Sequence, residues 1–339
     1  MKEFLIDLRT QLSNINIQTL ALVGSFVATV VLGLIIIPIL KRFKVGQVVR
    51  DDGPQSHLKK TGTPTMGGIM MLIVSTIASL IFGSKYPSII PVALVTLGYG
   101  IVGFIDDFKK LVLKNPKGLS PKLKMLGLLV ISFAFIIYLV ATGYGTDMYI
   151  PIIKTTISLP VVVYVLFNVF VMLACTNSLN LTDGLDGLAA GINAIIMVFF
   201  TFVCMAWGSK DMSIFSAIMV GTSVGFLLFN INPARVFMGD TGSLALGGAF
   251  CSVAIMLKVP LILIVVAGIC VWEALSVIIQ VTYFKLTNGK RVFKMAPFHH
   301  HLELSRYERN YYCSIILGNY YYTLRNSILY DIKQTCFKE

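Results

Sequence analysis

Long apolar stretches alternate with short polar segments along most of this chain. Each stretch is close to the ~20 residues that a helix needs to cross a hydrocarbon core about 30 Å thick. The stretches lie at residues 19–40, 66–83, 87–105, 125–143, 157–175, 188–207, 212–231, 242–257 and 259–284. Backbone N–H and C=O groups are too costly to leave unpaired in lipid, so every stretch predicts a helix. The pattern therefore predicts an all-α polytopic membrane protein with nine transmembrane helices.

The composition agrees with this interpretation. It is not the composition of a soluble domain, and it does not indicate a protein held together by disulfides or zinc. The chain is 56% hydrophobic and only 13% charged, far from the balance of a soluble domain. The first apolar stretch is too long for a signal-peptide core and follows a segment with both acidic and basic residues, so we expect it to remain as the first span. Six cysteines show no paired spacing. Neither a disulfide framework nor a zinc site is indicated.

The distribution of basic residues predicts the orientation in the membrane. Tracing nine crossings places 17 lysines and arginines in the loops of one side and six on the other. The positive-inside rule makes the rich side cytoplasmic and the N-terminus external. The net charge of +12 thus reflects topology rather than a nucleic-acid partner. All the acidic motifs below fall on the cytoplasmic side, so we expect an active site on the cytoplasmic face of the membrane.

The motif GFIDDFKK (103–110) ends the third predicted span with two adjacent carboxylates, Asp106 and Asp107. At the C-terminal end of a helix they oppose the helix dipole and repel each other unless a cation compensates them. Lys109, Lys110 or a divalent metal would supply this compensating positive charge. The alternative is a solvated helix end that carries no chemistry.

In NLTDGLDG (180–187), Asp183 and Asp186 stand three residues apart and would share one face of a helical turn. Helix capping is one explanation. The adjacent glycines, with Asn177 and Asn180 nearby, favour a second one, because glycine lets the backbone approach a phosphate or sugar closely.

The segment FNINPARVFMGDTGSLALGG (229–248) places Asp240 at the start of the eighth span, before Thr241, Gly242 and Ser243. Asp240 could simply be an N-cap. Free N–H groups at a helix start also bind anions, and Asp240 would place a metal beside that anion. Hard oxygen ligands next to phosphates suit Mg²⁺ better than zinc.

Three further features remain open at this level. In MAPFHHHLE (295–303) neighbouring histidines point in different directions, so one or two would enter a site and the rest would hold the loop. SHLKKTGTPTMGG (56–68) contains Lys60, which would bind a phosphate. An ordinary loop rich in glycine, threonine and proline would have the same composition. Glu273 lies inside the ninth apolar stretch, where an acid is either functional or hydrogen-bonded to a neighbour such as Gln280.

Taken in order across about residues 20–304, these five motifs resemble those of the bacterial phospho-N-acetylmuramoyl-pentapeptide transferases. These form a branch of the polyprenyl-phosphate N-acetylhexosamine-1-phosphate transferase superfamily. The acidic motifs are similar to those of the whole superfamily, whereas TPTMGG and the histidine run after MAP resemble this branch in particular.

The resemblance implies Mg²⁺-dependent transfer of phospho-N-acetylmuramoyl-pentapeptide from UDP to undecaprenyl phosphate, giving UMP and the first lipid-linked intermediate of peptidoglycan synthesis. It implies catalytic roles for Asp106, Asp107 and Asp240, with Asp240 as the Mg²⁺ ligand. The implied substrate-binding residues are Lys60, Lys110, Asn177, Asn180, Asp183, Asp186, Phe237, His299 and His300. The expected partners are the UDP-linked donor, undecaprenyl phosphate and the lipid bilayer, with a homodimer left open and no nucleic acid.

We divide the chain into a multi-span transferase domain, residues 1–304, and a distinct C-terminal segment, residues 305–339. The domain has predicted cytoplasmic loops at 41–65, 106–124, 176–187, 232–241 and 285–304. The resemblance implies a tenth span, but residues 305–339 are polar and rich in tyrosine and carry Arg325 in their most apolar part. A reading-frame change near codon 306 would explain this composition, and the nucleotide sequence of the gene tests it.

Two other functions are consistent with parts of this sequence. A related transferase that moves N-acetylglucosamine-1-phosphate to the same lipid would share the acidic motifs, but MAPFHHHLE argues against it. An ion-coupled transporter would place its acids near the bilayer midplane and often shows repeated halves, neither of which this sequence predicts.

Overall fold

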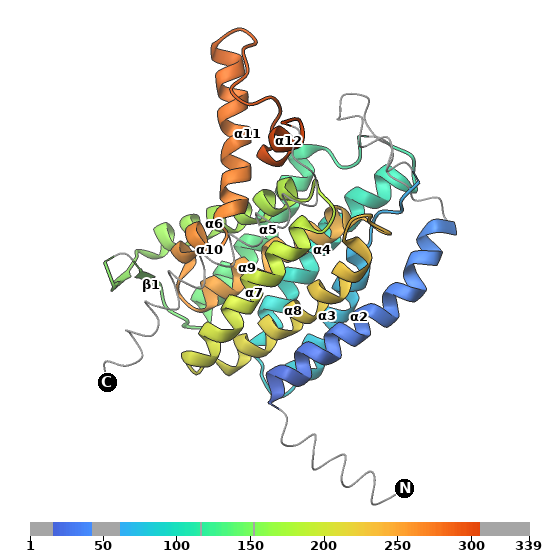
Figure 1. Ribbon diagram of the computed structural model, residues 1–339. Coiled ribbons are helices and arrows are strands. Elements are labelled where there is room, and N and C mark those ends of the chain that lie inside the picture. Colours follow the sequence, from blue (N-terminus) through green and yellow to red (C-terminus); the bar gives the residue numbers. More distant parts are fainter. Residues whose placement is uncertain (1–15, 43–61, 116, 152, 306–339) are drawn as a thin grey trace, which may run out of the picture.

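A computed structural model describes residues 16–42, 62–115, 117–151 and 153–305, which form a mostly helical bundle (Figure 1). Lys60, most of the predicted loop 41–65 and the segment after Ser305 lie outside these residues. Seven of the described helices are long and apolar enough to cross a membrane. They are α2 (Ile17–Arg42), α4 (Ile89–Leu111), α5 (Pro121–Ala141), α6 (Val161–Thr182), α7 (Leu188–Ala206), α8 (Lys210–Asn230) and α11 (Gly268–Leu286).

The shorter or less apolar elements account for the difference from the nine expected spans. They are α3 (Gly68–Gly83), α9 (Gly239–Met256), η2 (Pro260–Ile262), α10 (Leu263–Val266) and α12 (Phe298–Glu303), with strands β1 (Asp147–Ile150) and β2 (Thr155–Ser158). The predicted stretches at 66–83 and 242–257 both form helices, α3 and α9. The architecture is consistent with a polytopic membrane protein, and the count of nine spans stays a prediction.

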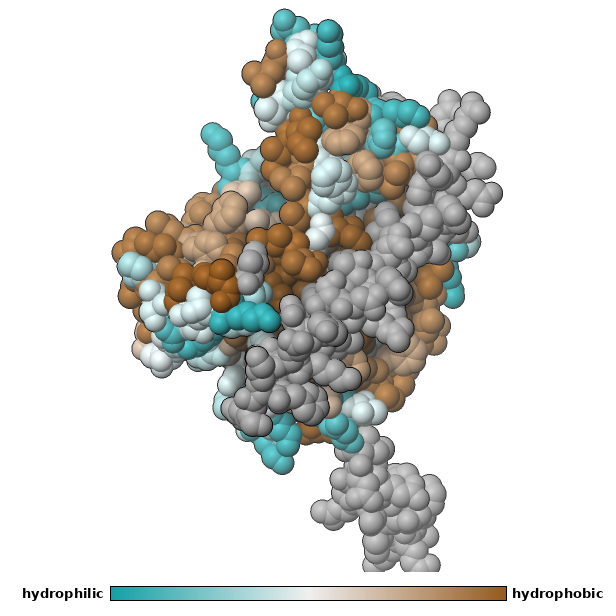
Figure 2. All heavy atoms as spheres, turned by 60° about the vertical axis from the view of Figure 1, so that its left-hand side comes forward, coloured by the Kyte–Doolittle hydropathy of each residue, from teal (hydrophilic) through white to brown (hydrophobic). Residues whose placement is uncertain are grey.

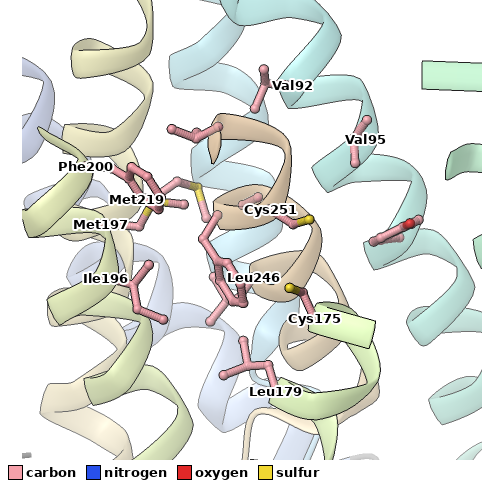
Figure 3. Close-up of a cluster of buried hydrophobic side chains, with 14 of the residues drawn as sticks. Val92, Val95, Cys175, Leu179, Ile196, Met197, Phe200, Met219, Leu246 and Cys251 are labelled. Atoms are coloured by element: carbon pink, nitrogen blue, oxygen red, sulfur yellow. The ribbon is translucent and has the colours of Figure 1, made fainter. Parts of the chain in front are cut away.

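Helix α9 lies at the centre of the bundle. Every residue from Thr241 to Met256 is buried, and the helix contacts α3, α4, α6, α7 and α8. Figure 3 shows Leu246 and Cys251 of α9 among apolar side chains from these neighbours, such as Leu179 of α6 and Met197 of α7. A helix enclosed by protein does not have to be apolar all round. This explains how α9 can carry four glycines and several polar residues in 18 positions.

The ninth apolar stretch is interrupted rather than continuous. It forms η2 and α10, and α11 then starts after a break at Ala267. Figure 1 shows α11 standing away from the bundle, with α12 beside it. This arrangement brings the histidine motif of α12 back onto the side of α11.

Large apolar side chains cover the outer surfaces of several helices. Val23, Val27 and Val31 of α2 are each about half exposed. Figure 2 shows hydrophobic residues over much of one face of the molecule, with hydrophilic residues at its upper and lower ends. Apolar side chains facing outward suit contact with lipid.

The all-α prediction missed a two-stranded hairpin. β1 and β2 pair antiparallel, with Asp147 opposite Ser158. The hairpin is tied to the segment after α9, since the Tyr149 N–H donates to the Lys258 carbonyl at 2.8 Å and the Lys258 ammonium lies 3.0 Å from Asp147. Strands of four residues give too short a pattern to recognise between two spans.

Candidate active site

The close crossing of α4 and α9 brings the GFIDDFKK motif next to the segment that holds Asp240. At Gly103 of α4, an added Cβ would lie 2.2 Å from the carbonyl oxygen of Asp240, so only glycine permits this approach. Asp106 and Asp107 follow one turn later on α4 and therefore lie beside the start of α9.

Asp107 binds the N-terminal end of α9. Its carboxylate accepts hydrogen bonds from the N–H of Asp240 (3.2 Å) and from the N–H and hydroxyl of Thr241 (2.9 and 2.7 Å). The residue before Asp240 is Gly239, whose φ of +77° is the left-handed conformation that glycine adopts readily. Asp107 thus satisfies N–H groups that a helix start leaves without intrahelical partners.

Asp106 and Asp240 share two lysines. Lys110 Nζ lies 2.7 Å from Asp106 and 2.9 Å from Asp240, and Lys124 Nζ lies 3.6 and 3.0 Å from the same carboxylate oxygens. Asp106 also accepts the N–H of Leu119 at 2.7 Å. The Asp106 side chain is 3% exposed, whereas that of Lys110 is 38% exposed. The structure thus joins the carboxylates of two motifs through ammonium groups that solvent can reach. We call these four residues the charged cluster.

Helix α6 joins the cluster through Asn180. Its amide nitrogen donates to Asp240 Oδ1 and to the Ser243 hydroxyl, both at 2.8 Å. Asn177, one turn earlier, donates to the Leu173 carbonyl of its own helix at 2.7 Å. Asn180 is therefore the asparagine that hydrogen-bonds to the charged cluster.

The DGLD segment, residues 183–186, lies shortly after Asn180 in the chain and packs on the loop before α9. Asp183 ends α6. Asp186 is buried and accepts the N–H of Ala234 at 3.4 Å, while the Gly187 N–H donates to Asn230 Oδ1 at 2.9 Å. These hydrogen bonds fix the DGLD segment against the loop that precedes α9.

Phe237 lies in a backbone ladder between the TPTMGG and VFMGD motifs. Its N–H donates to the Pro64 carbonyl, and its own carbonyl accepts the N–H of Gly67, both at 2.8 Å. Gly68 makes the same bond to Met238. The start of α3 is thereby fixed next to the start of α9.

The three histidines have separate environments. His299 is buried and bonds to Glu273 of α11 at 3.1 Å, while His300 Nδ1 lies 3.4 Å from Glu303. His301 accepts the N–H of Lys294 and so holds the loop before α12. Burial lowers the pKa of His299, and the Glu273 carboxylate opposes that shift.

Gln280, which the sequence suggested as a partner for Glu273, binds elsewhere. Its amide oxygen accepts the N–H groups of Val292 and Phe293, and its nitrogen donates to the Phe293 carbonyl. The suggested Glu273–Gln280 contact was therefore wrong. Helical spacing within α11 does not predict that the loop at residues 292–293 returns to contact Gln280.

Lys124 is the residue that the sequence interpretation missed. It lies in the first turn of α5 and was counted only as one basic residue in a loop. Nothing in its spacing distinguishes it from Lys122, which is exposed. Its position became evident only from the packing of α5 against α4.

The donor set of the site is mostly oxygen. Among the residues that the structure describes, no group of three or more His, Cys, Asp or Glu side chains could hold a metal ion. Asp106 and Asp240 supply two carboxylates that meet at the same lysine nitrogens.

Comparison with known proteins agrees with the motifs. The glycosyl transferase family 4 profile matches residues 89–258. The phospho-N-acetylmuramoyl-pentapeptide-transferase of Acetivibrio thermocellus is 52% identical over 295 residues, 86% of this chain and 88% of the relative. That of Halalkalibacterium halodurans is 50% identical over 297 residues, 86% and 90%. That of Clostridium acetobutylicum is 48% identical over 280 residues, 82% and 88%. The chain therefore belongs to the phospho-N-acetylmuramoyl-pentapeptide-transferase family.

Proposed function

We propose that this protein transfers phospho-N-acetylmuramoyl-pentapeptide from UDP to undecaprenyl phosphate, with release of UMP. The observation that carries the proposal is the charged cluster, in which Asp106, Asp240, Lys110 and Lys124 converge from three helices. Two ammonium groups next to two carboxylates suit a reaction between phosphates. The names of the relatives specify transfer of phospho-N-acetylmuramoyl-pentapeptide for those proteins.

Phosphoryl transfer requires positioning and charge neutralisation more than covalent chemistry from the protein. An oxygen of the lipid phosphate forms a bond to the sugar-bound phosphorus. The bond from that phosphorus to the bridging oxygen breaks, and UMP leaves with the electron pair. A phosphate monoester loses its second proton near pH 6, so it needs little help from a base such as Asp106. We favour this direct displacement over an aspartyl-phosphate intermediate.

Lys110 and Lys124 would neutralise the phosphates that meet in the site. Lys110 is the more accessible of the two, at 38% exposure against 18% for Lys124. Each already touches both carboxylates, so each holds its charge at a fixed place before substrate arrives. Asn180 of α6 donates a hydrogen bond to Asp240 and so holds the orientation of its carboxylate.

The residues present fit a magnesium ion. Mg²⁺ in such sites usually takes one or two carboxylates and completes its shell with substrate phosphates and water. Asp240 would hold it, with Asp106 as the nearest second carboxylate. When bound, the ion would stabilise negative charge on the transferring phosphoryl group.

We further propose nine membrane crossings with the charged cluster on the cytoplasmic face. Composition underestimates α9 as a span because protein surrounds it on all sides. Cysteine labelling tests the orientation: Lys122→Cys should react only after the inner membrane is permeabilised, whereas Lys85→Cys should react in intact cells. The reverse pattern would overturn the orientation.

The reaction is tested by incubating purified protein with UDP-N-acetylmuramoyl-pentapeptide, undecaprenyl phosphate and Mg²⁺ and measuring UMP. UDP-N-acetylglucosamine as the donor examines the related transferase activity. Release of UMP from the first donor alone supports the proposal, and release from the second alone replaces it.

Asp240→Asn is the decisive variant. It should abolish UMP release at saturating Mg²⁺ while the protein stays folded in detergent. Asp147→Asn is the matched control, because Asp147 lies in the β1–β2 hairpin, where its carboxylate pairs with Lys258 and Ser158. Full activity of Asp240→Asn would rule out the metal-ligand assignment.

A further inference from the structure

Glu273 and His299 form a buried pair between α11 and α12. Both side chains are 1% exposed, and His299 Nδ1 lies 3.1 Å from Glu273 Oε2. The same oxygen lies 3.3 Å from the backbone nitrogen of His299. An acid this deeply buried is costly unless it is paired. Two contacts to one residue indicate that Glu273 serves to hold His299.

An ionised Glu273 carboxylate can only accept hydrogen bonds, so its contacts indicate which ring nitrogen of His299 carries the proton. A backbone N–H can only donate, so Oε2 acts as an acceptor toward His299. The Nδ1 atom that approaches the same oxygen is then the second donor. In the neutral ring, Nε2 is left as the hydrogen-bond acceptor. Burial lowers the pKa of His299, which favours the neutral ring.

The Nε2 atom lies at the DGLD segment. It is buried and has no hydrogen-bond partner within the part of the chain that the structure describes. A Cβ added at Gly184 would lie 2.1 Å from it, so the ring edge rests where residue 184 has no side chain. Gly184 follows Asp183 directly. A buried acceptor without a partner costs about 1–3 kcal/mol, which a donor group in this place would recover.

We propose that Glu273 is a positioning residue that fixes His299 as the neutral Nδ1–H tautomer, so that Nε2 accepts a hydrogen bond from an uncharged O–H or N–H group of the UDP-sugar. This inference rests on the proposed function. It differs from a phosphate-binding role, because phosphate oxygens at neutral pH need a donor and Nε2 of this tautomer is an acceptor.

Two variants of Glu273 separate the hydrogen bond from the charge. Glu273→Gln keeps an oxygen that can accept from both His299 donors, so donor affinity should stay within about threefold of wild type. Glu273→Leu removes the acceptor, and the KM for the UDP-sugar should rise roughly tenfold, as the loss of one hydrogen bond predicts. The KM for undecaprenyl phosphate should not change. Ser276→Ala, one turn along α11, is the matched control and should behave as wild type.

The results for these variants distinguish a positioning role of Glu273 from a requirement for its charge and from a purely structural role. A loss in Glu273→Gln as large as in Glu273→Leu would show that charge is required and overturn the neutral tautomer. No loss in Glu273→Leu, or an equal loss for both substrates with a lower melting temperature, would overturn the positioning role. If Glu273→Leu does not fold, His299→Gln replaces it, since its side-chain oxygen can retain the acceptor and should keep donor affinity better than His299→Ala.

A spectroscopic measurement makes the inference independent of activity. The chain has four histidines, so ¹⁵N-labelled histidine gives few signals, and His299→Gln identifies that of His299. We expect an unprotonated Nε2 and a protonated Nδ1 at neutral pH. A protonated Nε2 would overturn the tautomer even if the enzyme is active. Failure of wild-type protein to release UMP would instead sink the proposed function and leave this result standing.

Discussion

Thr241 donates two hydrogen bonds to one oxygen of Asp107, from its N–H at 2.9 Å and from its hydroxyl at 2.7 Å. The two residues belong to different helices, α9 and α4. The family resemblance implies a catalytic role for Asp107. The hydrogen bonds give it a second task, which is to cap α9 and hold Asp240 in place.

Asp107→Ala should therefore damage stability as well as activity. Loss of a helix cap costs about 1 kcal/mol, and the start of α9 would shift with it. We expect a lower melting temperature in detergent and little UMP release. Thr241→Val removes only the hydroxyl bond and should lower the melting temperature less. An unchanged melting temperature in Asp107→Ala would contradict the capping role.

Lys124→Met should lower kcat/KM by about 10- to 100-fold, the range for losing a hydrogen bond between charged groups. Lys124 touches Asp240 at 3.0 Å, so its loss leaves the cluster more negative and less able to hold phosphates. Lys122→Met is the control, because Lys122 lies on the same helical turn and is exposed. Steady-state UMP release measures both, and equal effects would contradict a specific role for Lys124.

Gly184→Ala should impair donor binding, because the new methyl group would occupy the position 2.1 Å from His299 Nε2. Either the DGLD segment or the imidazole has to move. Gly24→Ala is the control, since a Cβ there meets nothing within 4 Å and alanine is favourable in a helix. Titration of the UDP-sugar into each purified variant gives the comparison. Wild-type affinity in Gly184→Ala would contradict the close packing.

Acidification should destabilise the protein partly through His299. Burial lowers its pKa in the folded state, while Glu273 opposes the shift and the neighbouring groups are His300 and Glu303. The unfolded chain then binds the proton more readily, so this contribution to stability is complete above about pH 6.5 and is lost as the pH falls below that value. Melting temperatures between pH 8 and 5 should decline less in His299→Gln than in wild type. Parallel declines would contradict this contribution.

Much of the helical framework could be predicted because each span is encoded locally. The stretch at 188–207 corresponds to α7 (Leu188–Ala206), and that at 212–231 to α8 (Lys210–Asn230). The break in the ninth stretch was not predicted. The residues on the N-terminal side of the break, 259–267, are all apolar, and apolar length does not reveal where a helix turns away from its neighbours.

The sequence by itself determined the apolar segments, the acidic and histidine motifs and the family resemblance, because all of these depend on residues close together in the chain. Only the tertiary structure decided which side chains from distant parts of the chain contact each other. Lys110 meets Asp240 across 130 residues, and Asp107 meets Thr241 across 134. Contacts over such separations depend on how helices cross. Small residues such as Gly103 set the crossing, and no pattern within one helix records which neighbour it will meet.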